Sequence, residues 1–458
     1  MSFYIALIPL TLLSFLLGTN LFIFKELSSD GPNQIVLLFT TFITGFLGIL
    51  LKKTTYKNIE EKIFETLSSS LYVLIFVILI GFLMSSWMAG GVVPSLIYYG
   101  LKILHPKLFL PLTTLICSLV SFTIGSSWST GATLGVAFMG MGKILGFPPA
   151  LVAGAIISGC YFGNTFSPLS ETSVLSCTLN KNSLTEHTKF TAKLGFITIL
   201  LALVIYLIIG LFLHTNASIS IDETLKSIET FYTISWLPLF IPVIVLGLII
   251  LKVPSLVAIS SGVFLGILSW LFLQKGEKSY TFLVHFLLKG HSVDIQEPFL
   301  QKLFSGGGVY DLFSILLLII TAIIFGATME SSGFLQDISN KILSYIHGKL
   351  SLITSTLISG ILFNGLLSDD YLSIIVTSKI YNPLYQEFKI DLKELTRAIQ
   401  ASSTVTAGLV PWCTGGAFFM GILDVPVSSY APYSFYNILC PLVCFILTYY
   451  NMKKNTSY

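Results

Sequence analysis

Three acidic side chains lie in or beside apolar stretches of the sequence, where a charged residue is costly. Glu171 lies in GCYFGNTFSPLSETS (159–173), whereas Asp369 and Asp370 lie in FNGLLSDDYLS (363–373). Ionisable residues at membrane depth are rare and mark ion pathways and proton relays. A carboxylate that binds either a proton or a small cation couples the two ions by competition. These three acids are therefore the first candidates for ion chemistry.

Hydroxyl and amide side chains surround these acids and could complete a cation site. Carboxylate, hydroxyl and carbonyl oxygens suit a small hard cation, so we predict that Glu171 and Asp369 take Na⁺ or H⁺ alternately. Asp369 is favoured over Asp370 because Ser368-Asp369 aligns with Ser126-Ser127 in an internal repeat. The alternatives are a helix cap for each aspartate and a cap or lysine ion pair for Glu171. The expected supporting ligands are Asn164, Ser167, Thr172, Asn364, Ser368, Thr404 and Thr406.

The composition places these residues in a membrane protein. Of the 458 residues, 54% are hydrophobic and only 10% are charged, whereas a soluble domain has about 25% charged residues. This shortage of polar side chains excludes a soluble enzyme, a nucleic-acid-binding protein and a disordered chain. A transmembrane helix needs about 20 apolar residues, so we expect an all-α polytopic protein with about 11 or 12 transmembrane helices.

Apolar runs of spanning length alternate with stretches that Gly, Pro, Ser and Thr interrupt, chiefly 125–180 and 400–432. The first run has no basic region before it and no small-residue cleavage site, so we expect a retained span and not a signal peptide. The apolar runs are 3–24, 34–51, 71–89, 108–124, 194–213, 235–251, 253–273, 311–329, 351–367 and 435–450.

The two halves of the sequence resemble each other in register. Residues 105–116 (HPKLFLPLTTLI) match 347–358 (HGKLSLITSTLI) at His, Lys and Thr as well as at Leu and Ile, and Pro168 aligns with Pro411. Many secondary transporters contain inverted repeats, and discontinuous helices in corresponding places form the binding site near the midplane. We therefore predict an internal repeat with broken helices around the paired prolines.

This repeat divides the chain into four parts. We expect N-terminal spans in 1–70, a first transport repeat in 71–214, and a second transport repeat in 311–452. Connecting spans and a polar linker are expected in 215–310, where Gly306-Gly307-Gly308 marks the linker.

Three long segments resemble the signature regions of the NhaC-type sodium/proton antiporters, an ion-transporter superfamily group that includes malate/lactate antiporter-like members. The resemblance implies a fold of two inverted repeats with broken or re-entrant helices. It implies secondary active exchange of Na⁺ for H⁺ by alternating access in the bacterial cytoplasmic membrane. It also implies that the protein needs no cofactor besides the transported ions. The segments are SSWSTGATLGVAFMGMGKILGFPPALVAGAIISGCYFGNTFSPLSETS (126–173), LSDDYLSIIVTSKIYNPLY (367–385) and SSTVTAGLVPWCTGGAFFMGILDVP (402–426).

Departures from the family pattern allow more than one transported solute. Asn164 stands where the family has the aspartate of FGD, and Glu171 stands for the aspartate of SPLSDT. Gln400 and Ala401 replace an acidic pair, and Cys413 replaces the asparagine of PWNT. The alternative function is therefore a sodium- or proton-coupled exchanger of an organic acid, malate- or lactate-like, or of an amino acid.

An intramembrane enzyme is the alternative from another class. The sequence contains neither H-E-x-x-H nor G-x-S-x-G, which are the patterns of zinc and serine hydrolases, so we expect no enzyme activity and no catalytic residue. The expected partners are small cations, an organic acid under the alternative function, and the lipid bilayer, but no nucleic acid. A homodimer remains open.

Overall fold

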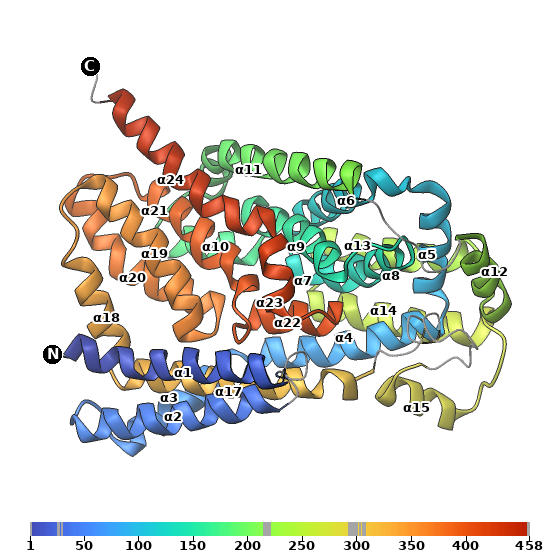
Figure 1. Ribbon diagram of the computed structural model, residues 1–458, viewed down its shortest axis with the longest axis horizontal. Coiled ribbons are helices and arrows are strands. Elements are labelled where there is room, and N and C mark those ends of the chain that lie inside the picture. Colours follow the sequence, from blue (N-terminus) through green and yellow to red (C-terminus); the bar gives the residue numbers. More distant parts are fainter. Residues whose placement is uncertain are drawn as a thin grey trace.

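The computed structural model describes residues 2–24, 28, 31–213, 221–291, 301, 304 and 308–455. Helices account for nearly all of this part of the chain, and most of the longer ones run along the long axis of the molecule (Figure 1). The first eleven are α1 (Ser2–Phe24), α2 (Pro32–Leu50), α3 (Tyr56–Ser69), α4 (Leu71–Ala89), α5 (Val92–Ile103), α6 (Phe109–Ile124), α7 (Ser127–Thr130), α8 (Val136–Ile144), α9 (Pro149–Phe166), α10 (Glu171–Leu179) and α11 (Leu184–Phe212).

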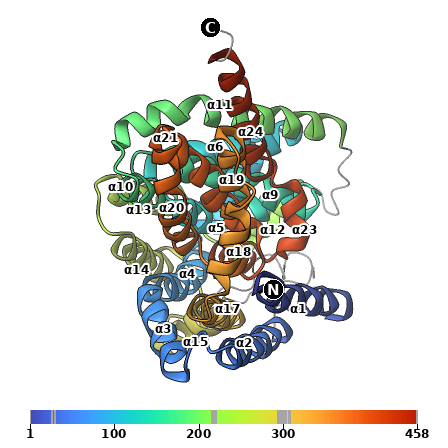
Figure 2. The same cartoon turned by 90° about the vertical axis from the view of Figure 1, so that its left-hand side faces the viewer.

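The second part of the chain continues the bundle, and Figure 2 shows α17 beside α2 and α3. The remaining helices are α12 (Ile221–Phe231), α13 (Phe240–Ile250), α14 (Ser255–Leu273), α15 (Tyr280–Lys289), α17 (Phe313–Ser331), α18 (Phe334–Leu343), α19 (Lys349–Leu367), α20 (Asp370–Glu387), α21 (Leu392–Ile399), α22 (Thr414–Leu423), α23 (Val427–Tyr430) and α24 (Phe435–Asn455).

The lengths and composition of these helices confirm a polytopic membrane protein. Within the described residues, nine helical segments are long and apolar enough to cross a membrane, and up to eleven if each bent pair counts as one span. One bent pair joins Leu392–Leu409 to Thr414–Leu423 at 44°, at the predicted second break. The first predicted break separates α9 from α10. The division into two repeats stays a prediction, and Gly306 and Gly307 of the expected linker lie outside the described residues.

Helix α9 lies in the interior of the bundle, where small residues allow close packing. Its backbone approaches α6 so closely that a Cβ on Gly159 would lie 2.5 Å from the carbonyl oxygen of Thr114. Small residues are enriched at helix interfaces in membranes because they let two backbones approach. This contact packs the second half of α9, which leads to the break, against α6.

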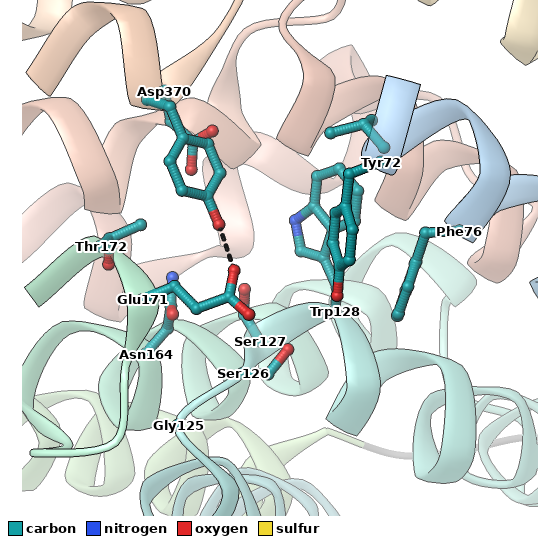
Figure 3. Close-up of a pocket in the computed structure, with 12 residues that line it drawn as sticks. Tyr72, Phe76, Gly125, Ser126, Ser127, Trp128, Asn164, Glu171, Thr172 and Asp370 are labelled. Carbon is teal, nitrogen blue, oxygen red and sulfur yellow. Dashed lines mark hydrogen bonds between the residues drawn. The ribbon is translucent and has the colours of Figure 1, made fainter. Parts of the chain in front are cut away.

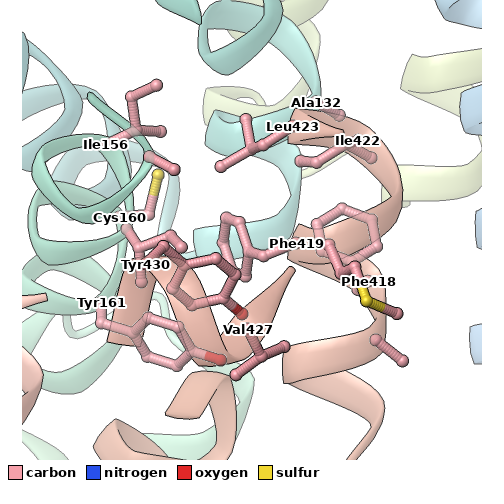
Figure 4. Close-up of a cluster of buried hydrophobic side chains, with 14 of the residues drawn as sticks. Ala132, Ile156, Cys160, Tyr161, Phe418, Phe419, Ile422, Leu423, Val427 and Tyr430 are labelled. Atoms are coloured by element: carbon pink, nitrogen blue, oxygen red, sulfur yellow. The ribbon is translucent and has the colours of Figure 1, made fainter. Parts of the chain in front are cut away.

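An apolar core holds the second broken helix against α9. Figure 4 shows the side chains of Phe418, Phe419 and Tyr430 in this core, together with Ile156 and Tyr161 of α9. Phe419 and Tyr430 are fully buried, and the Tyr430 hydroxyl donates a hydrogen bond to the carbonyl of Gly408 at 2.7 Å. The core thus brings the two interrupted stretches of the sequence together.

Candidate functional site

Two helices of the site, α7 and α20, begin after the same kind of backbone turn. Gly125 directly follows the last residue of α6, and Ser368 directly follows the last residue of α19. Both have a left-handed backbone conformation, with φ of 81° and 59°. The next residue then caps the following helix, and these caps are Ser126 and Asp369. By position Ser126 therefore corresponds to Asp369, one residue away from the sequence alignment that paired it with Ser368.

The side chain of Asp369 caps the start of α20. Its Oδ1 accepts a hydrogen bond from the backbone N–H of Leu372 at 2.9 Å, and its Oδ2 accepts one from the Thr414 hydroxyl at 3.3 Å. The backbone N–H of Thr414 also donates to the carbonyl of Ser368 at 2.9 Å. Asp369 and Ser368 thus join the start of α20 to the start of α22.

Asp370 does not cap the helix, and one oxygen of its carboxylate has no partner in the described part of the chain. Its side chain is only 4% exposed, and its Oδ1 has no hydrogen-bond partner among the described residues. A buried polar atom without a partner is costly, and an unseen ion or water is one explanation for it. Two consecutive acids at a helix start are the signal that could have identified Asp370, because one caps the helix and leaves the other free.

Asp370 lines an open pocket with about 470 Å³ of empty volume. Figure 3 shows its carboxylate on one side of the pocket, with Glu171 below it and the rings of Tyr72, Phe76 and Trp128 opposite. The polar residues on the pocket are Ser126, Ser127, Asn164, Glu171, Thr172 and Asp370. The sequence did not identify Ser126, Ser127 or the three rings as site residues.

Glu171 reaches the same pocket from the first break. It is the first residue of α10, directly after the non-helical residues 167–170, and its side chain is exposed. The hydroxyl of Tyr371, in the first turn of α20, donates a hydrogen bond to Glu171 Oε2 at 2.8 Å. The structure therefore brings Glu171 together with Asp370, and Asp369 lies beside the pocket as a cap.

Two of the predicted supporting ligands, Asn164 and Thr172, line this pocket. Ser170 connects them, because its hydroxyl donates to Asn164 Oδ1 at 3.1 Å and lies 3.0 Å from Thr172 Oγ1. Ser167 is not on the pocket: its Oγ accepts a hydrogen bond from the backbone N–H of Leu169 at 3.1 Å. The role of Ser167 is therefore to hold the turn between α9 and α10.

The other predicted ligands form a second polar group around a π-helical turn, Gln400–Thr404. The Asn364 amide donates to the carbonyl of Ser403 at 2.6 Å and to Thr406 Oγ1 at 3.0 Å. Single π-helical turns often occur at functional sites. Buried oxygens without a partner among the described residues are Asn364 Oδ1, Ser368 Oγ, Gln400 Oε1, Ser403 Oγ and Thr404 Oγ1.

One hydrogen bond connects the two polar groups. The amide of Gln400 donates to the backbone carbonyl of Thr172 at 2.8 Å, so the π-helical turn contacts the start of α10. Across the described residues no cluster of three or more His, Cys, Asp or Glu side chains could hold a metal ion. The oxygen atoms that line the pocket are of the kind that binds a small hard cation.

Comparisons with known proteins find relatives that match most of the chain. A profile of the Na⁺/H⁺ antiporter family matches residues 1–211 and 197–452. The malate-2H⁺/Na⁺-lactate antiporter of Bacillus subtilis (strain 168) is 34% identical and is matched over 88% of this chain and 86% of its own length. The Na⁺/H⁺ antiporter NhaC of Alkalihalophilus pseudofirmus is 27% identical, with 94% and 92% covered. The arginine/ornithine antiporter ArcD of Halobacterium salinarum is 29% identical, with 92% and 87% covered.

Proposed function

The chain belongs to the Na⁺/H⁺ antiporter family, and from this premise we propose that it exchanges Na⁺ for H⁺ across the bacterial cytoplasmic membrane by alternating access. The observation that carries the proposal is the shared pocket of Glu171 and Asp370. Two carboxylates on one small pocket repel each other when both are charged, and a proton or a cation relieves that repulsion.

The exchange follows from competition at these two carboxylates. In one stage they carry protons, and in the other Na⁺ binds between them. Asn164 and Thr172 supply neutral oxygens on the same pocket. The pocket lies beside the first break, and Asp369 connects it to the second through Thr414. Broken helices of this kind form the substrate and ion sites of many secondary transporters.

Asp369 and Asp370 offer a matched pair of variants for testing the proposal. In everted vesicles from a host without its own sodium/proton antiporters, a respiratory pH gradient is established and Na⁺ is then added. Asp370→Asn should abolish the Na⁺-dependent loss of the gradient. Asp369→Asn should retain most of it, because asparagine caps a helix about as well as aspartate. Full exchange by the double variant Glu171→Gln, Asp370→Asn would overturn the proposal.

A solute exchanger is the second candidate function. The malate/lactate and arginine/ornithine antiporters among the relatives favour it. In the same vesicles, Na⁺ alone would then leave the pH gradient intact. The gradient would be lost only after malate, lactate or an amino acid is added as well, and that result would replace simple Na⁺/H⁺ exchange with coupled solute exchange.

A further inference from the structure

We propose that the pocket binds an organic ammonium group beside the ion-binding carboxylates, so that an organic solute of this antiporter is a cationic amine and not an organic acid. The inference rests on the proposed function of the same pocket and adds the charge class of the organic solute that the second candidate function requires. It is carried by three features of the pocket: its charge, its aromatic side, and a buried carboxylate oxygen without a partner.

The negative charge of the pocket disfavours an organic acid as the solute and favours an organic cation. Its lining includes the two acids Glu171 and Asp370, and none of the described lining residues is Lys, Arg or His. An organic acid would place its carboxylate next to these groups without a counter-charge, and like charges within a few ångströms destabilise each other. An ammonium group would instead neutralise the pocket.

The aromatic side of the pocket suits a large cation. The rings of Phe76 and Trp128 lie 5.9 Å apart, and Tyr72 is stacked 6.1 Å from Phe76. The cation–π contacts of the described residues involve other rings, so no protein cation covers these three. Aromatic faces attract ammonium groups, above all those with apolar methyl groups. A small ion that binds through oxygen ligands does not need aromatic rings in its site.

The unpaired oxygen of Asp370 points to a ligand independently of the rings. Asp370 is 4% exposed, it lines the pocket, and its Oδ1 accepts no hydrogen bond from the described residues. A cation between Asp370 and the rings would compensate this buried charge.

Tetramethylammonium is a suitable probe because it has no proton to lose. A primary amine can cross the membrane as the neutral base and collapse a pH gradient by itself, whereas a quaternary ammonium cannot. We expect tetramethylammonium and choline to raise the Na⁺ concentration that gives half-maximal exchange in everted vesicles. The neutral analogue of choline, 3,3-dimethylbutan-1-ol, should have no effect. Equal competition by this alcohol, or competition by lactate or malate without any by tetramethylammonium, would overturn the inference.

Trp128→Leu and Trp236→Leu form a matched pair. Trp128 lies on the pocket and stacks on Phe418 at 4.4 Å, whereas Trp236 stacks on Tyr99 at 4.0 Å and is 61% exposed outside the pocket lining. Trp128→Leu should weaken tetramethylammonium binding about 2- to 30-fold, the range expected for one cation–π contact. Trp236→Leu should leave it unchanged, and equal effects of both variants would refute the aromatic contribution.

Calorimetry separates a failure of this inference from a failure of the proposed function. Tetramethylammonium is titrated into the purified full-length protein, so that no transport is required. Absence of Na⁺-dependent exchange with retained, Trp128-sensitive binding would overturn the antiport proposal alone. Normal Na⁺/H⁺ exchange without any tetramethylammonium binding would overturn the inference alone.

Discussion

The two adjacent aspartates should separate stability from ion binding. In Asp369→Ala the backbone N–H of Leu372 loses its acceptor at 2.9 Å and the Thr414 hydroxyl loses its acceptor at 3.3 Å. Replacing a capping aspartate by alanine costs about 0.5–2 kcal/mol, and one further hydrogen bond is worth about 1 kcal/mol. We therefore expect Asp369→Ala to lower the free energy of unfolding by about 2 kcal/mol.

The assay is reversible unfolding by SDS in mixed micelles, with and without Na⁺. A ligand at 100 times its dissociation constant stabilises the folded state by about 2.7 kcal/mol. Asp369→Ala should lose stability by the same amount in both conditions, so the increment due to Na⁺ is preserved. Asp370→Asn should lose that increment instead, because it removes a ligand and leaves the cap in place.

The opposite pattern would refute the reasoning. A conservative Asp369→Asn variant that loses the Na⁺ increment, beside an Asp370→Asn variant that keeps it, would identify Asp369 as the ion carboxylate. The choice of Asp369 from the sequence would then be correct, and the choice of Asp370 from the pocket geometry would be wrong.

Three further predictions concern single contacts. Gly159→Ala should lower the free energy of unfolding by about 1–3 kcal/mol in the same assay, because its Cβ would overpack the interface with α6. Tyr371→Phe removes a hydrogen bond to Glu171 that is worth about 1 kcal/mol, so the Na⁺ concentration for half-maximal exchange should rise about fivefold. Partial burial lowers the pKa of Lys62, but the hydrogen bonds and charges of Glu330 and Glu65 together outweigh it, and the pKa lies above its usual 10.5. Lys62→Met should therefore cost about 0.5 kcal/mol at neutral pH, and this difference should vanish as the pH rises through that pKa.

The sequence predicts the apolar helices well, because hydropathy alone determines them. The expected span 71–89 coincides with α4, and the expected span 351–367 falls within α19 (Lys349–Leu367). The breaks around Pro168 and Pro411 were also predictable, since proline interrupts the hydrogen bonding of a helix. The polar helix α20 was missed, because its buried Asp, Ser and Thr residues are covered only by tertiary packing.

The site was predictable by region but not by residue. Glu171, Asn164 and Thr172 lie on the pocket as a group, whereas the choice between Asp369 and Asp370 depends on the left-handed turn at Ser368. A single residue's shift in that turn decides which acid caps α20. Hydropathy does not change with such a shift. The aromatic side of the pocket could not be predicted either, because it forms only when α4 packs near Trp128.

The absence of a basic residue from the described pocket lining has an electrical consequence. With a proton on each of its two carboxylates the pocket is neutral, and with one Na⁺ in place of both protons it carries one net negative charge. Each exchange cycle would then move one elementary charge, which is worth about 2.3 kcal/mol per 100 mV of membrane potential. Voltage alone could drive sodium out of the cell, even in a medium where the pH difference across the membrane has disappeared.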